Sequence, residues 1–114
     1  MRIVTNFYFL QSLAQSKSKE KRRLIIDWAT NEHIRTVCEL FLNVLRGLVP
    51  LPEHIYNLLN RKKTVIRVLT NRKVNFSLKR NILKRNKSLI ETLPELLEII
   101  KKIVPEFHNS RHVL

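Results

Sequence analysis

The sequence predicts an all-α protein, a compact bundle of about five or six short helices that associates with itself. Apolar residues recur at helical spacing in every apolar segment. No run alternates apolar and polar residues between glycine turns, and Val74-Asn75-Phe76 is too short to build a sheet. The chain has 114 residues, enough for one domain at most, and is 44% hydrophobic. A monomer of this size cannot bury so large a share of apolar residues, which favours a homo-oligomer.

Residues 1–29 are expected to form an N-terminal amphipathic helix followed by a basic segment. Polar residues interrupt the apolar run that a secretion signal would need. The segment 16–23, SKSKEKRR, is expected to be exposed, either as the solvated first turn of a second helix or as a basic arm of the nuclear-import kind. The apolar side of the first helix comprises Ile3, Phe7, Leu10 and Leu13.

Residues 30–104 are expected to be the helical core domain. Its first helix begins at Thr30-Asn31-Glu32, where a side-chain oxygen can accept from free backbone N–H groups. It ends at Gly47, because glycine adopts the left-handed conformation at low cost, and Pro50 forbids continuation. The apolar stripe of this helix comprises Ile34, Val37, Cys38, Phe41, Leu45 and Leu48.

The rest of the core domain is expected to be helical as well. Pro52 suits the first position of a helix that continues either as one or as two pieces broken near Asn60-Arg61. Ser77 is expected to cap the next helix. Pro94 either kinks that helix or begins the last one, which Pro105 stops. The apolar side of the helix after Ser77 comprises Leu78, Ile82, Leu89 and Leu93.

The basic residues are concentrated in one window. The net charge is +13, and the 37 residues between Glu53 and Glu91 contain no acid. A solvated helix face ordinarily carries both acidic and basic residues, because like charges repel each other. The absence of acidic residues from this window therefore favours a polyanionic partner. We call residues 61–87 the basic strip. The cations predicted to bind nucleic acid there are Arg61, Lys62, Lys63, Arg67, Arg72, Lys73, Lys79, Arg80, Lys84, Arg85 and Lys87.

The pattern also indicates the kind of nucleic acid. Helical spacing places Arg80, Lys84 and Lys87 on one face, as a basic ridge apart from the apolar residues. The chain has one Trp, and Tyr8 and Tyr56 are scattered, which gives little support to a platform that stacks single-stranded bases. We therefore expect contacts to the backbone of duplex DNA with little dependence on base sequence.

Other chemistry is not predicted. A single glycine excludes phosphate-binding loops, dinucleotide fingerprints and nucleophile elbows, so we expect no enzyme, no cofactor and no small-molecule substrate. Cys38, the lone cysteine, is expected to be a buried structural thiol in a reducing, intracellular setting. His108 and His112 lack further zinc ligands and fall in residues 105–114, expected to be a frayed tail.

Two further expectations concern the surface of the protein. The acids Glu91, Glu95 and Glu98 recur at helical spacing without a paired histidine, which favours a solvated acidic face. No apolar run approaches the ~18 residues that a membrane span needs, so a membrane partner is not expected.

Part of the chain resembles a known group of proteins. The similarity covers about residues 30–83 and is clearest in the stretch from Ile34 to Leu51, continuing through Ile66-Arg67-Val68-Leu69. These residues resemble short basic proteins of Polinton or adintovirus-like elements, which have been likened to the adenoviral core protein X precursor, a DNA-condensing virion component. Such relatives often end in a Gly-rich apolar tail, whereas Ser88 to Val104 contain no glycine here. The most specific matches are Glu39, Asn43, Leu45, Gly47, Pro50 and Leu51.

The resemblance implies a protein that coats or condenses duplex DNA in the host nucleus or in a virion core, and the composition agrees. The basic strip would neutralise DNA phosphates and release counterions. The charge pattern leaves two alternatives open. One is a helical interaction or regulatory module whose strip docks an acidic partner, and the other is a protein that binds anionic membrane surfaces through its amphipathic N-terminus.

Overall fold

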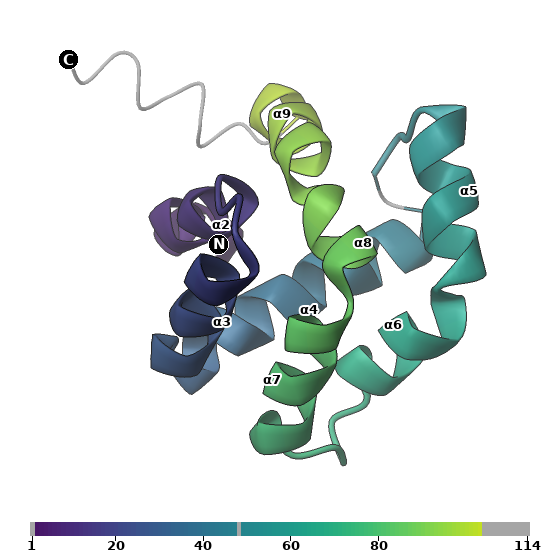
Figure 1. Cartoon of the computed structure of the whole chain (residues 1–114). Helices are drawn as coiled ribbons and strands as arrows, with labels where there is room; N and C mark the ends of the chain where they lie inside the picture. Colours follow the sequence, from purple (N-terminus) through teal and green to yellow (C-terminus); the bar gives the residue numbers. More distant parts are fainter. Residues whose placement is uncertain (1, 48, 104–114) are drawn as a thin grey trace, which may run out of the picture.

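The computed structural model describes residues 2–47 and 49–103, and its regular secondary structure there is entirely helical (Figure 1). The all-α fold class is confirmed, but the expected five or six helices are too few, because turns divide several of them. Within the described residues the helices are α1 (Arg2–Thr5), α2 (Phe7–Ala14), α3 (Lys19–Trp28), α4 (Asn31–Leu45), α5 (Glu53–Arg61), α6 (Lys63–Thr70), α7 (Phe76–Arg85), α8 (Lys87–Glu91) and α9 (Leu93–Ile103).

Polar residues mark the breaks between these helices. Asn6 separates α1 from α2, and its buried amide donates to Thr36 Oγ1 on α4 over 2.9 Å. Lys62 separates α5 from α6, which resolves the expected segment into two helices. Asn86 has a non-helical backbone (φ −108°, ψ 70°) and ends α7. Pro94 is the second residue of α9 and lies in its first turn, so it belongs to the start of the last helix and does not kink the preceding one.

Local capping explains why α4 is well defined. Thr30 Oγ1 accepts from the backbone N–H of His33 at 3.1 Å, and the Thr30 N–H donates to His33 Nδ1 at 3.2 Å. At the other end Gly47 has φ +74°, the left-handed conformation expected of a residue that follows a helix. Both predicted ends are confirmed. The expected cap at Ser77 is wrong, because Asn75 Oδ1 accepts from the Leu78 N–H at 2.8 Å and caps α7.

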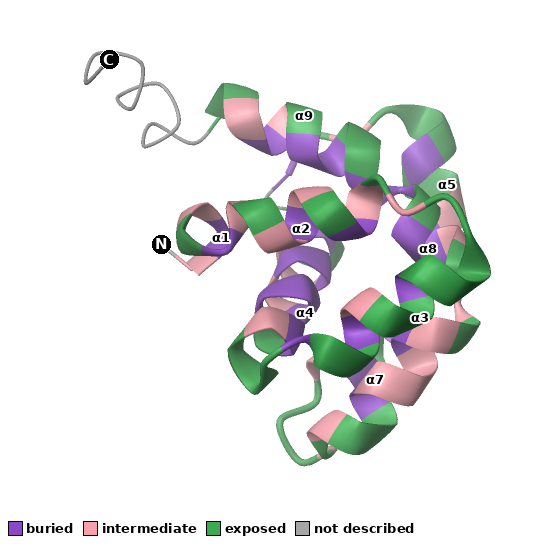
Figure 2. Ribbon diagram, turned by 60° about the vertical axis from the view of Figure 1, so that its left-hand side comes forward, coloured by how far each residue is buried: buried purple, intermediate pink, exposed green. Residues whose placement is uncertain are grey.

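The core lies around α4, which packs against α1, α6 and α7, while α2 packs against α3, α8 and α9. Figure 2 shows buried residues along the inner sides of α2, α4 and α9. Phe41 is fully buried, as expected. Leu45 was expected in the core but is 36% exposed, since it is the last residue of α4, next to the turn at Gly47. Leu78 is also exposed, in the first turn of α7.

The N-terminal segment differs from expectation in two respects. The amphipathic helix is divided into α1 and α2, although Ile3, Leu10 and Leu13 are buried on one side as expected. Ser18 caps α3, but Arg22 in the expected exposed segment is only 5% exposed. Arg22 and Ile26 share the face of α3 that packs on its neighbours.

Some expectations fall outside the described residues. These are the tail at 105–114 with its two histidines, and the place of Leu48. In the part of the chain that is described, no helix has the length and apolar character needed to cross a bilayer.

Candidate nucleic-acid interface

Five of the exposed cations of the basic strip lie between the end of α5 and the link that precedes α7. The burial of Ile66 and Leu69 places Lys63 and Arg67 on the opposite, exposed side of α6, four residues apart. Arg61 precedes them at the end of α5, and an exposed pair of cations follows in the link 71–75. We call these five residues the α6 cationic surface: Arg61, Lys63, Arg67, Arg72 and Lys73.

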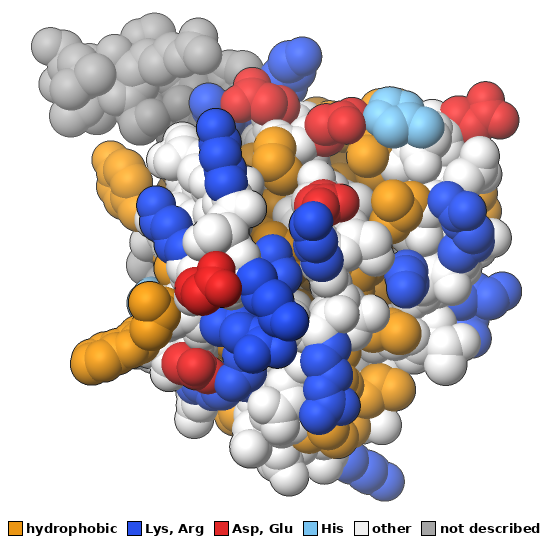
Figure 3. Space-filling model, in the orientation of Figure 1, with side chains coloured by type: hydrophobic (Ala, Val, Ile, Leu, Met, Phe, Trp, Pro, Cys, Tyr) orange, Lys and Arg blue, Asp and Glu red, His pale blue; other side chains and the backbone are white. Residues whose placement is uncertain are grey.

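No acidic residue compensates this surface in the described chain. None of the ion pairs found within the described residues, 2–47 and 49–103, involves these five cations. In the view of Figure 3, the Lys and Arg side chains over α5 and α6 have no Asp or Glu beside them, whereas those between α3 and α7 are flanked by acids. The α6 cationic surface is therefore an uncompensated positive patch.

Two other cations of the strip, Arg80 and Lys84, are bound within the protein. Arg80 on α7 donates to the backbone carbonyls of Ile26 at 2.9 Å and Ala29 at 2.7 Å, and to Asn31 Oδ1 at 2.8 Å. Lys84 donates to Asp27 Oδ1 at 2.5 Å. These contacts satisfy carbonyls at the C-terminal end of α3 and place positive charge there, as the helix dipole favours.

The expected ridge of Arg80, Lys84 and Lys87 is therefore not a free surface. Lys87 also has a partner, Glu91 at 3.5 Å one turn along the chain. The ridge was expected from helical spacing alone, and spacing does not show that α3 packs on α7.

Arg80 is expected to stabilise the fold. Arg80→Met should lower the free energy of unfolding by about 2–4 kcal/mol, because it removes three hydrogen bonds from a charged donor to the end of α3 and to Asn31. Arg85→Met on the same helix removes an exposed cation and should change it by about 0.5 kcal/mol or less. Urea unfolding of the two variants measures both. Equal losses would show that the Arg80 contacts do not hold α7 to α3.

A hollow of about 510 Å³ lies next to this surface, between α4 and the segment formed by the link 71–75 and α7. Lys79 lines it and is only 7% exposed, contrary to its expected place on the surface strip. Arg72 lines it from the link, and Arg35 from α4. Arg35 was not expected at the site, because only the packing of α7 on α4 brings it there.

Cys38 also lines the hollow and is buried, as expected. Burial raises the pKa of its thiol from 9.0 to about 11, an effect that the positive charge of Lys79 opposes and Glu39 adds to. The thiol is therefore protonated near neutral pH, which does not favour a nucleophile.

The acids near the C-terminal end of the described chain pair locally. Glu91 contacts Lys87, Glu95 contacts His54 Nε2 at 3.1 Å, and Glu98 contacts Lys101 at 3.6 Å. All three carboxylates are exposed, as expected of a solvated acidic face, but the packing of the chain pairs Glu95 with a histidine, which the sequence did not lead us to expect.

Comparison with known proteins found no family model, no curated protein and no solved structure that matches this chain.

Proposed function

We propose that this protein binds the phosphate backbone of duplex DNA, with little dependence on base sequence, and coats or condenses it. The observation that carries the proposal is the α6 cationic surface, five exposed cations without an acidic partner among the described residues. Cations held in this way neutralise phosphates and release the counterions condensed on DNA. The resemblance to short basic proteins of Polinton or adintovirus-like elements supports a place in the host nucleus or a virion core.

The rigid part of this surface is α6. Lys63 and Arg67 lie about 6 Å apart along the helix axis, and the buried Ile66 between them fixes the helix to the core. The backbone carries a phosphate on every nucleotide, so a fixed row of cations follows the strand without reading bases. Condensation requires more than one DNA contact in each assembly. Self-association supplies it, and the exposed Trp28, 84% accessible, offers apolar surface for such association.

A pair of matched double variants tests the place of the site. Lys63→Glu with Arg67→Glu should reduce affinity for a short duplex strongly, because both cations are exposed and uncompensated. Lys17→Glu with Lys19→Glu changes the net charge equally at exposed positions before and in the first turn of α3, and should matter much less. Fluorescence anisotropy gives the affinities, and circular dichroism checks that both variants keep their helices.

The outcome also separates the proposal from its alternatives. Equal losses in the two double variants would mean that DNA responds to overall charge and that no defined surface exists. If polyglutamate binds as tightly as duplex DNA and with the same dependence on Lys63 and Arg67, an acidic protein partner is the better interpretation. If the protein binds vesicles of anionic lipid, and substitution of the apolar residues of α2 abolishes that binding, a protein that binds membrane surfaces is the better interpretation.

A further inference from the structure

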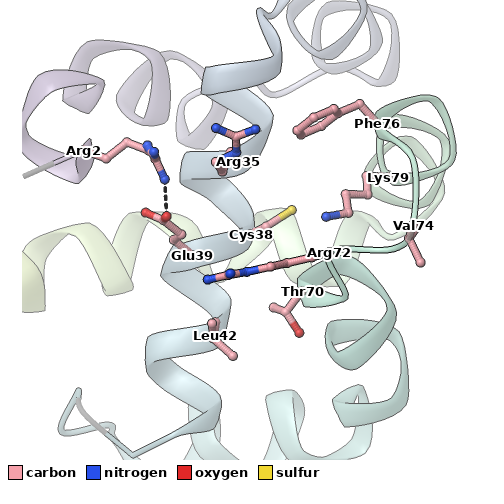
Figure 4. A pocket seen from close by; sticks show the side chains of 10 residues that line it. All are labelled: Arg2, Arg35, Cys38, Glu39, Leu42, Thr70, Arg72, Val74, Phe76 and Lys79. Carbon is pink, nitrogen blue, oxygen red and sulfur yellow. Dashed lines mark hydrogen bonds and ion pairs between the residues drawn. The ribbon is translucent and has the colours of Figure 1, made fainter.

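The hollow beside α4 is lined from two sides. Figure 4 shows Arg35, Cys38, Glu39 and Leu42 on the α4 side, with Arg72 and Lys79 extending toward them from the link and from α7. The complete lining is Arg2, Arg35, Cys38, Glu39, Leu42, Thr70, Arg72, Val74, Phe76 and Lys79. Its polar groups therefore converge from elements that are distant in sequence.

The charge of this lining is strongly positive. It contains four cations and one carboxylate, and that carboxylate, Glu39, already forms an ion pair with Arg2. Arg35, Arg72 and Lys79 have no acidic partner in the described part of the chain. Three uncompensated cations on one concave surface attract a compact anion.

Lys79 is the most informative of the three. It is only 7% exposed, and no hydrogen-bond acceptor for its ammonium group is found within residues 2–47 and 49–103. Its Nζ lies 5.5 Å from the centre of the Phe76 ring, and the Arg35 guanidinium lies 5.4 Å from the centre of the same ring. Lys79 extends into the hollow (Figure 4), where its ammonium group can donate a charge-assisted hydrogen bond to a bound oxyanion.

We propose that this hollow binds one phosphoryl group, held by Arg35, Arg72 and Lys79. Its volume of about 510 Å³ exceeds a single phosphate and suits a phosphate that carries an organic part. Leu42 and Val74 line the remainder and give that part an apolar surface. The phosphoryl group comes either from the DNA backbone or from a small phosphorylated molecule. The site does not depend on the proposed DNA-binding function.

Titration calorimetry of the full chain with pyrophosphate at constant ionic strength tests the site. The wild type should bind it saturably, and Lys79→Met should weaken binding roughly tenfold or more, because a charge-assisted hydrogen bond is lost. Arg72→Gln, at an exposed position, should weaken it as well. Lys17→Met removes the same charge elsewhere and should leave binding unchanged. Absence of saturable binding, or equal loss in Lys79→Met and Lys17→Met, overturns the proposal.

Two readouts distinguish a ligand site from a structural role of Lys79. Without anion, Lys79→Met should melt no lower than the wild type, because the Lys79 side chain forms no hydrogen bond or ion pair within the described residues and methionine keeps its apolar stem packed. Bound pyrophosphate should also slow modification of Cys38 by a thiol reagent at alkaline pH, since a nearby anion disfavours the thiolate. A lower melting temperature together with unprotected Cys38 would show that Lys79 is structural and would overturn the proposal.

A competition experiment identifies the source of the phosphoryl group. If it belongs to DNA, pyrophosphate should compete with a short duplex, and Lys79→Met should weaken duplex binding. If it belongs to a small molecule, Lys79→Met should leave duplex affinity unchanged while pyrophosphate binding is lost. Both results support the site. If the protein binds pyrophosphate through Lys79 but binds no duplex at low salt, the phosphoryl site is supported and the proposed DNA-binding function is wrong.

Discussion

Affinity for duplex DNA is expected to fall by about 10³–10⁴ when salt rises from about 50 to 200 mM. The reason is the number of phosphates that the structure allows the basic strip to neutralise. Of its eleven cations, those whose side chains form no hydrogen bond or ion pair in the described chain, apart from the buried Lys79, are Arg61, Lys62, Lys63, Arg67, Arg72, Lys73 and Arg85. Seven contacts correspond to a slope of about −6 in log affinity against log salt.

Fluorescence anisotropy over a series of salt concentrations measures this slope directly. Two duplexes of unrelated sequence should give the same slope and nearly the same affinity, because phosphate contacts carry no sequence information. A slope near zero would show that the protein does not bind DNA through its phosphates. A slope near −10 would mean that all eleven cations contact phosphates, and would contradict the assignment of Arg80 and Lys84 to contacts with α3.

Replacing Phe41 by alanine is expected to lower the free energy of unfolding by about 3–5 kcal/mol. Phe41 is fully buried on α4, the helix that packs against α1, α6 and α7, so its loss leaves a cavity among several elements. A domain of this size has a total stability of about 5–15 kcal/mol, so the variant should be close to unfolding. Urea denaturation followed by circular dichroism gives the value.

Leu45→Ala on the same helix is the matched control. Leu45 is 36% exposed at the end of α4, and its truncation should cost about 1 kcal/mol or less. If the two variants lose the same stability, the last turn of α4 belongs to the core and the assignment of Leu45 to the surface is wrong.

Local signals made the fold class and the ends of α4 predictable. The cap at Thr30 and the turn at Gly47 depend on a few neighbouring residues, which the sequence shows directly. The break between α5 and α6 was only narrowed to the region of Asn60-Arg61, because basic and apolar residues on both sides are compatible with a continuous helix. Periodicity identifies apolar faces well and interruptions of a helix poorly.

Tertiary packing decided the features that the sequence did not show. Asn6 breaks the N-terminal helix while its amide contacts Thr36, thirty positions away. Arg80 donates to carbonyls of α3 more than fifty positions earlier, and no local pattern distinguishes it from the exposed Arg85. The cations of the hollow could not be predicted from local sequence either, because Arg35 and Lys79 come together only where α4 packs on α7.

Chemical-shift mapping by nuclear magnetic resonance with a short duplex locates the DNA contact on the protein. Amide signals from residues 61–73, which include Lys63 and Arg67 on the exposed side of α6, are expected to shift most as duplex is added at low salt. Signals from the outer face of α2 should stay in place. Shifts confined to α2 and α3, or the absence of any shift at low salt, would contradict the assignment of DNA binding to the α6 cationic surface.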